Sequence, residues 1–208
     1  RRHVPRRSLP MEPMQTEERR LTVERNVPVD ALYMAFHMCS RNHPDYYAFD
    51  MLSDLLSSGR SSRFVQHLVQ DKQIFNSIDA YISGSIDNGL FHIVGKPAPE
   101  KTLEEAEKAI WEELALLTEG SIDENELEKV KNRYESEQIF NNLNYLNVAT
   151  NLAYFELIGK AEDINTEVEK YRSVTQEQIK RAAKQTFLPE NCSVLYYKAA
   201  AKGASHTP

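Results

Sequence analysis

The chain has 208 residues, of which 41% are hydrophobic and 27% are charged, and its formal net charge is −6. This length and composition are enough for about one domain with a hydrophobic core. The acidic balance argues against a nucleic-acid partner. No apolar run approaches the roughly 20 residues of a membrane-spanning helix. We therefore expect a soluble domain.

The two cysteines, Cys39 and Cys192, are far apart in sequence, and each lies in or beside an apolar run. We expect both to be free and buried, because a free cysteine packs as a small hydrophobic residue. A disulfide between them would form only in an oxidising compartment. The chain begins at Arg1 with no Met and no apolar signal segment, so we expect it to be a piece of a longer polypeptide.

Residues 1–17 are expected to be a linker from a preceding domain. They carry three prolines, no periodicity and a short basic cluster, Arg1, Arg2, Arg6 and Arg7. A single domain is expected over residues 18–198. Residues 199–208 are small and polar, which predicts a second linker or tail.

The first half of the domain predicts two strands, a helix and a hairpin. Apolar and polar residues alternate over 21–25, and the nearly continuous apolar run 29–38 predicts a strand buried on both faces. A helix is expected from His43-Pro44, with its apolar stripe on Ala48, Met51, Leu52, Leu55 and Leu56. Alternation over 78–86 and the turn Asp87-Asn88-Gly89 predict two antiparallel strands.

Between helix and hairpin, Gly59 is expected to end the helix in a left-handed conformation. Ser61 or Ser62 would then cap a short second helix that buries Phe64, Val65 and Leu68.

The second half predicts helices followed by a last strand over 191–197. Three capping boxes mark helix starts: Thr102 with Glu105, Asp123 with Glu126, and Thr175 with Gln178. Residues 139–158 form a mostly apolar, asparagine-rich helical stretch, and no specific role is assigned to the asparagines over 141–151. The fold class expected is α+β, a two-layer domain whose mixed or antiparallel sheet is covered on one face by helices.

Four segments in this order resemble one protein family. They are the apolar strand followed by His43-Pro44-Asp45, the turn Gly59-Arg60-Ser61-Ser62-Arg63, the helix start at 122–131, and Val174-Thr175-Gln176-Glu177-Gln178-Ile179. The chain thereby resembles the C-terminal, non-catalytic type of domain in the pitrilysin/insulinase-like (M16) zinc metallopeptidases. The resemblance covers residues 21–197.

The resemblance implies a zinc endopeptidase in which homologous domains close like a clamshell around an unfolded peptide. The catalytic domain of that family carries His-x-x-Glu-His on a helix, where two histidines bind zinc and the glutamate activates water. None of the six histidines here belongs to that motif or its reverse; they are His3, His37, His43, His67, His92 and His206. We therefore expect no catalytic residue, no metal site and no cofactor in this chain, and zinc in the parent protein or a partner.

Further expectations follow from the resemblance. Many family members carry an arginine and, seven residues later, a tyrosine, and both side chains reach the substrate. The matching positions here are Val69 and Asn76. Val69 has no hydrogen-bond donor, and Asn76 is too short and lacks the phenol, so neither is expected to contact the substrate in this way. Ser61, Ser62 and Arg63 are the candidate substrate or chamber residues. The partners implied are a homologous zinc-bearing domain and an unfolded peptide, in the cytoplasm or periplasm of a bacterium.

Two alternatives stay open. The parent could be a pseudo-peptidase scaffold or assembly subunit without proteolysis, which a His-x-x-Glu-His motif elsewhere in the parent would exclude. A stand-alone hydrolase of another kind is weaker, because Ser61 and Ser62 lie outside any Gly-x-Ser-x-Gly elbow and where helix caps are expected.

Overall fold

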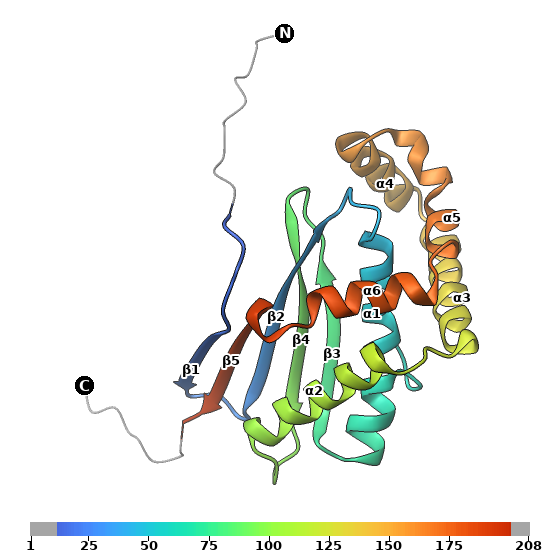
Figure 1. Ribbon diagram of the computed structural model, residues 1–208. Helices are drawn as coiled ribbons and strands as arrows, with labels where there is room; N and C mark the ends of the chain where they lie inside the picture. Colours follow the sequence, from blue (N-terminus) through green and yellow to red (C-terminus); the bar gives the residue numbers. More distant parts are fainter. Residues whose placement is uncertain (1–11, 201–208) are drawn as a thin grey trace.

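The computed structural model describes residues 12–200, which form one five-stranded sheet and a layer of helices (Figure 1). The sheet order is β1-β5-β2-β4-β3, with β1 parallel to β5 and every other pair antiparallel. The expected α+β class with a mixed sheet is confirmed. The strands are β1 (Arg19–Arg25), β2 (Ala31–Ser40), β3 (Phe75–Ser83), β4 (Asn88–Pro97) and β5 (Cys192–Ala199).

The helical layer is built mainly from long helices in the second half of the chain. The α-helices are α1 (Tyr46–Ser57), α2 (Leu103–Glu119), α3 (Glu124–Asn141), α4 (Tyr145–Ile158), α5 (Glu167–Arg172) and α6 (Gln176–Thr186). A π-helix, η1 (Phe64–Asp71), follows α1, and two 3-10 turns, η2 (Ala161–Asn165) and η3 (Pro189–Asn191), complete the helical segments. No helix among residues 12–200 is both long and apolar enough to cross a bilayer.

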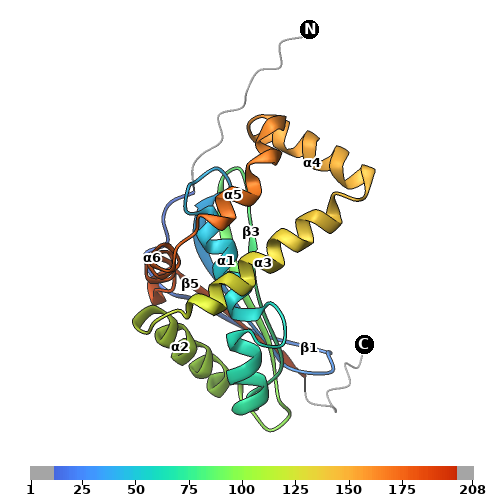
Figure 2. The same cartoon turned by 90° about the vertical axis from the view of Figure 1, so that its right-hand side faces the viewer.

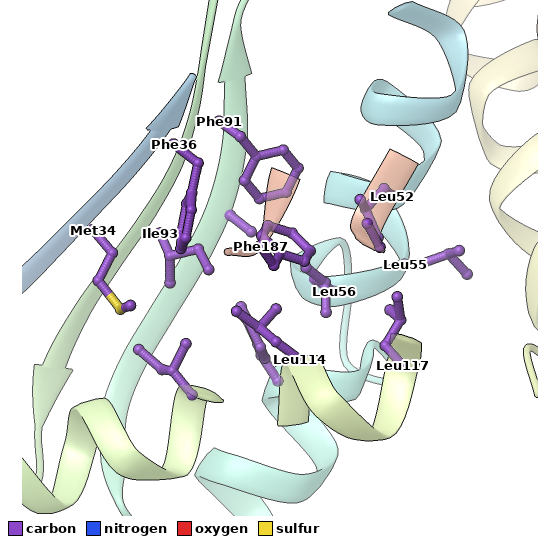
Figure 3. Close-up of a cluster of buried hydrophobic side chains, with 14 of the residues drawn as sticks. Met34, Phe36, Leu52, Leu55, Leu56, Phe91, Ile93, Leu114, Leu117 and Phe187 are labelled. Atoms are coloured by element: carbon purple, nitrogen blue, oxygen red, sulfur yellow. The ribbon is translucent and has the colours of Figure 1, made fainter. Parts of the chain in front are cut away.

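The hydrophobic core lies between one face of the sheet and helices α1, α2 and α6 (Figure 1). Phe187, which follows α6, packs edge-to-face on Phe36 of β2 and Phe91 of β4, with ring centroids 5.2 and 5.1 Å apart (Figure 3). Leu52 and Leu56 of α1 reach the same cluster from the helical side (Figure 3). Such aromatic pairs add stability beyond the apolar area they bury.

Most of the predicted helix ends are confirmed. Gly59 has φ +89° directly after α1, as a left-handed end requires. The capping boxes of α2, at Thr102 and Glu105, and of α6, at Thr175 and Gln178, are both present. The hydrophobic partners beside these boxes, including Val174 and Ile179, are buried.

One predicted cap is wrong, and one predicted capping box is incomplete. Neither Ser61 nor Ser62 caps η1, which begins after Arg63 without any side-chain cap. Asp123 does cap α3, accepting from the N–H of Asn125 at 3.3 Å, but Glu126 does not complete a box. Glu126 instead binds Arg63, because a guanidinium offers a carboxylate two charged donors where a backbone offers one neutral N–H.

The helical stretch expected over residues 139–158 is interrupted at 142–144, between α3 and α4. One further expectation needs correction. Strand β2 is not buried on both faces: Leu32, Met34 and Phe36 are buried, whereas Tyr33 on the other face is 40% exposed. The helices of the described residues cover one face of the sheet only (Figures 1 and 2).

The domain limits stay a prediction. Within the expected linker, Gln15 is buried and donates to the carbonyl of Cys192 at 2.8 Å. The arginine cluster 1–7, His3 and His206 lie outside the described residues. Cys39 and Cys192 are both free, with Cys192 buried and Cys39 half-buried.

Candidate functional site

The turn that follows Gly59 is held tightly against α3. The guanidinium of Arg63 binds the carboxylate of Glu126 through two bonds, Nε to Oε1 at 2.8 Å and Nη2 to Oε2 at 2.9 Å. These bonds raise the pKa of Arg63, against the opposing effect of burial. Arg63 also donates to the carbonyl of Ser121 at 3.3 Å. The ion pair therefore joins the start of η1 to the start of α3.

The two serines of this turn differ in their surroundings. Ser62 is buried, and its hydroxyl donates to the carbonyl of Gly59 at 2.7 Å. Ser61 is exposed and contacts the ammonium of Lys129 on α3. A substrate or chamber role for Ser61, Ser62 and Arg63 stays a prediction, and Ser61 is the one of the three with an exposed side chain.

The positions matched to the family's arginine and tyrosine lie on two different elements. Val69 is on η1, half-buried against the core, and Asn76 is exposed on β3. The Val69 side chain has no polar atom, and the Asn76 side chain makes no hydrogen bond within residues 12–200.

The histidines of the described residues lie on four different segments: His37 on β2, His43 before α1, His67 on η1 and His92 on β4. His43 accepts the N–H of Asp45 through Nδ1 at 3.1 Å, which is the helix-entry role expected for it. His92 lies on β4, where its Nε2 is 2.9 Å from the hydroxyl of Ser83 and its ring stacks on Tyr81. Burial lowers the pKa of His92. His92 is thus the hydrogen-bonded, sheet-facing histidine that its alternation predicted.

His67 forms a pair that the sequence did not predict. Its Nδ1 is 2.9 Å from Oε2 of Glu113 on α2, and Glu113 is only 1% exposed. Within residues 12–200, no group of three or more His, Cys, Asp or Glu side chains is arranged to hold a metal ion. A zinc site with several ligands does not fit the residues present here.

The sheet face away from the helices carries a band of apolar side chains. Cross-strand pairing places Leu21, Leu195, Tyr33 and Val94 in one row across four strands. The adjacent row contains Ala35, His92 and Tyr81. A groove of about 410 Å³ lies over this band, lined by Leu21, Tyr33, Ala35, His92, Val94 and Leu195 together with Arg19, Arg20, Met34, Ser193 and Val194.

We call this band and its groove the open sheet face. The apolar run of β2 predicts burial on both sides, but it does not show which chain covers the second side, so this open face was not predicted. The sequence signal that could have indicated it is the presence of apolar residues on both faces of β2, β4 and β5.

Charged side chains at the β1 end of the sheet are paired on the helical side. Arg20 of β1 binds the carboxylate of Glu107 on α2, and Tyr196 and Trp111 donate to the same carboxylate at 2.6 and 3.2 Å. Burial alone would raise the pKa of Glu107, but these donors lower it. This network attaches β1 and β5 to α2.

A second polar cluster joins α5 to the start of α1. Arg41, which follows β2, forms a buried ion pair with Glu167 of α5. Tyr47 donates to the second carboxylate oxygen of Glu167 at 3.2 Å, and Tyr171 donates to Asp50 at 2.5 Å. Next to this cluster lies a pocket of about 260 Å³ whose lining includes Asn42, His43, Phe155, Ile158 and Lys170.

Comparison with known proteins identifies the fold and the family. The family model described as "Peptidase M16 inactive domain" matches residues 3–134. The chain is 25% identical to the "Uncharacterized zinc protease YmxG" of Bacillus subtilis over 170 residues, which is 81% of this chain and 41% of that protein. This chain therefore spans about two fifths of the length of that relative.

Two solved structures share the fold. "The crystal structure of a protease from Helicobacter pylori" matches with a TM-score of 0.84 at 22% identity. The match covers 89% of this chain and 45% of the Helicobacter pylori chain. The inactive peptidase domain of a putative zinc protease from Bordetella parapertussis has a TM-score of 0.74 at 16% identity, covering 84% of this chain and 95% of its own. Because the family model matches more than half of the chain, this chain belongs to the peptidase M16 family, as an inactive domain of the kind found in zinc proteases.

Proposed function

We propose that this chain is the non-catalytic domain of a zinc metalloendopeptidase whose homologous zinc-bearing domain lies elsewhere in the same polypeptide or in a partner subunit. The observation that carries the proposal is membership of the M16 inactive-domain family, together with a relative named as a zinc protease of which the matched region covers only 41%. In this assembly the domain forms part of the wall of a chamber that holds an unfolded peptide, and zinc is bound by the other domain.

The open sheet face supports a role as a domain interface. Three strands carry apolar residues on both faces, which is typical of sheets covered on both sides. An exposed apolar band with a groove of about 410 Å³ marks a surface for another protein segment. We propose that the homologous zinc-bearing domain covers this face.

The proposal is tested on the assembled parent protein beside the isolated 208 residues. The assembled protein is expected to contain zinc and to cleave a long unstructured peptide in a reaction that a chelator abolishes. The isolated chain is expected to do neither, because its described residues supply no set of metal ligands. Zinc binding and cleavage by the isolated chain would contradict the proposal.

The same experiment distinguishes this proposal from the alternative, a pseudo-peptidase scaffold. An assembled protein that binds no zinc and cleaves no peptide would instead be a pseudo-peptidase scaffold. Val69 and Asn76, which replace the arginine and tyrosine of many family members, are compatible with either outcome if another domain supplies these groups.

A further inference from the structure

Strand β3 forms one edge of the sheet and pairs with a single neighbour, β4, in the part of the chain that the structure describes. An edge strand presents unpaired backbone N–H and C=O groups, to which another extended chain can add. In an antiparallel pair, alternate residues direct these groups away from the neighbouring strand. The groups on the outer side of β3 therefore determine whether a further strand can bind there.

The composition of β3 does little to oppose such an addition. Its nine residues include a phenylalanine, a tyrosine and two isoleucines, which favour strands, and one charged residue, Asp79. The other edge strand, β1, has four charged residues among its seven, and charged side chains on an edge oppose pairing with another strand. Strand β3 therefore needs protection of another kind.

Two side chains bind the outward backbone groups of Ala80, in the middle of β3. The N–H of Ala80 donates to Oδ1 of Asp79 at 3.0 Å. The hydroxyl oxygen of Ser57, the last residue of α1, lies 2.9 Å from the carbonyl oxygen of Ala80 and 2.9 Å from the same Oδ1. Because a hydroxyl has one hydrogen, Ser57 donates it to one of these two acceptors at a time. The N–H and the C=O of Ala80 thus both have a side-chain partner.

The burial of Ala80 agrees with these contacts. Helix α1 lies beside β3 (Figure 1), and its C-terminal end brings Ser57 to the edge of the sheet. Ala80 is only 5% exposed although it belongs to an edge strand. Ile78 and Ile82 direct their backbone groups to the same side as Ala80. A strand that added to this edge would therefore find the central residue covered and would lose both hydrogen bonds to it.

We propose that the Ser57–Asp79 pair closes the β3 edge to extended polypeptide backbone, whether from a second copy of this chain or from an unfolded peptide. The two side chains satisfy the backbone groups that a new strand would need. In the chamber proposed above, an unfolded peptide would then not be held by strand addition to β3. The inference uses contacts within the described residues only, so it depends neither on zinc nor on the partner domain.

The test begins with amide hydrogen exchange at Ala80, measured by NMR on the isolated chain at low concentration. The double variant Ser57→Ala/Asp79→Ala removes both side-chain partners. Asp79→Asn is the matched control, because it removes the charge and keeps an acceptor oxygen for the Ala80 N–H. The double variant is expected to exchange this hydrogen about tenfold faster than the native chain, with Met34 of the central strand β2 unchanged. The Asp79→Asn control is expected to stay close to the native rate.

The second measurement asks whether a strand adds to the opened edge, and from which source. If a second copy adds, raising the concentration of the double variant slows exchange at Ala80 again and produces dimers in sedimentation. If an unfolded peptide adds, an excess of a long unstructured peptide slows exchange at low protein concentration. Either result supports the proposal and identifies the source, provided that the native chain and Asp79→Asn show neither.

Three results would overturn the proposal. Unchanged exchange at Ala80 in the double variant would show that the pair does not protect this edge. Faster exchange without dimers and without protection by the peptide would show that α1 closes the edge without the pair. Strand addition to Asp79→Asn would assign the protection to charge. If circular dichroism shows that the double variant is unfolded, Asp79→Ala alone, which frees the Ala80 N–H, is measured in the same way and judged by the same results.

Discussion

Gly59 shows how one residue directs the chain out of α1. Its φ of +89° is a conformation that L-residues avoid. A Cβ at this position would lie 3.1 Å from Nη1 of Arg133, so the added carbon also meets a side chain of α3. The backbone conformation and the neighbouring helix both favour glycine.

Gly59→Val is expected to lower the free energy of unfolding by about 2 kcal/mol, because a β-branched residue resists the left-handed conformation. Urea unfolding of the isolated chain measures this loss. Arg60→Ala, which changes an exposed neighbour, serves as the control and is expected to have little effect. An unchanged unfolding midpoint for Gly59→Val would show that Gly59 is not required for this turn.

Ser61 and Ser62 are adjacent but are expected to respond differently to alanine. Ser62→Ala removes a buried hydroxyl that donates to the carbonyl of Gly59, at an expected cost of about 1 kcal/mol. Ser61→Ala alters an exposed side chain and is expected to stay within about 0.5 kcal/mol of the native chain. Thermal unfolding of the two variants tests the difference, and equal losses would contradict it.

The buried carboxyl group of Asp54 on α1 is expected to make the stability of the domain depend on pH. Burial, together with the nearby charge of Asp50, raises the pKa of Asp54 to about 6, despite the opposing effects of Ser58 and Arg133. In the unfolded chain its pKa is about 3.9. The folded state therefore binds the proton more tightly, and stability from this residue falls as pH rises from about 4 to about 6.

Asp54→Asn is expected to flatten stability over this pH range and to raise it at pH 7, by at most about 3 kcal/mol. Denaturant unfolding between pH 4 and pH 7 measures the effect. Asp87→Asn, at an exposed position in the β3–β4 turn, is the control. An Asp54→Asn variant whose stability parallels that of the native chain at every pH would refute this assignment.

At the scale of elements, the ion pair between Arg63 and Glu126 joins η1 to α3 across 63 residues of sequence. Both side chains are largely shielded from solvent, at 13% and 22% exposed. A shielded bidentate pair is stronger than an exposed one. The structure thus gives Arg63 a role in holding two elements together, whatever its role in the chamber.

A double-mutant cycle with Arg63→Met and Glu126→Gln is expected to give a coupling energy of about 1–2 kcal/mol. The exposed pair Lys72 and Glu112 is the matched control, with an expected coupling below about 0.5 kcal/mol. If Arg63→Met left stability unchanged but raised the KM of the assembled peptidase, a substrate role would be favoured over the structural one.

Two apolar surfaces of the molecule are left uncovered by the described residues. One is the open sheet face, and the other is formed by the end of α3 and by α4, where Phe140, Leu146 and Leu157 are all more than 70% exposed. A domain that functions alone rarely exposes apolar patches of this kind. Both surfaces are consistent with a domain that is completed by a homologous neighbour.

Tyr33→Asp places a charge on the open sheet face, at a residue that is 40% exposed in this chain. The isolated domain is expected to stay folded, with its melting temperature changed by only a few degrees. Association with the zinc-bearing domain is expected to weaken at least tenfold, because the carboxylate would be buried without a partner. Ultracentrifugation of the assembled variant measures this, and undiminished association would show that this face is not an interface.

Local sequence patterns predicted the order of nearly all the elements, the caps of α2 and α6, and the left-handed residue after α1. These features depend on residues within a few positions of one another, so a local pattern is sufficient. The family resemblance followed from the same local segments, which are arranged in a recognisable order. The lack of a His-x-x-Glu-His motif can likewise be seen in the sequence alone.

Long-range packing, and no local pattern, makes Glu126 bind Arg63 instead of completing a cap. The same is true of the parallel pairing of β1 with β5 at the edge, of the π-helix η1, and of the apolar surfaces that remain uncovered. These outcomes depend on contacts between residues far apart in sequence. Such contacts compete with local hydrogen bonds, and a short sequence pattern does not show which of the two forms. Apolar residues on both faces of a strand predict that both faces are buried, but the layer that covers one of them can come from another domain. In the described residues of this chain, only one face of the sheet is covered.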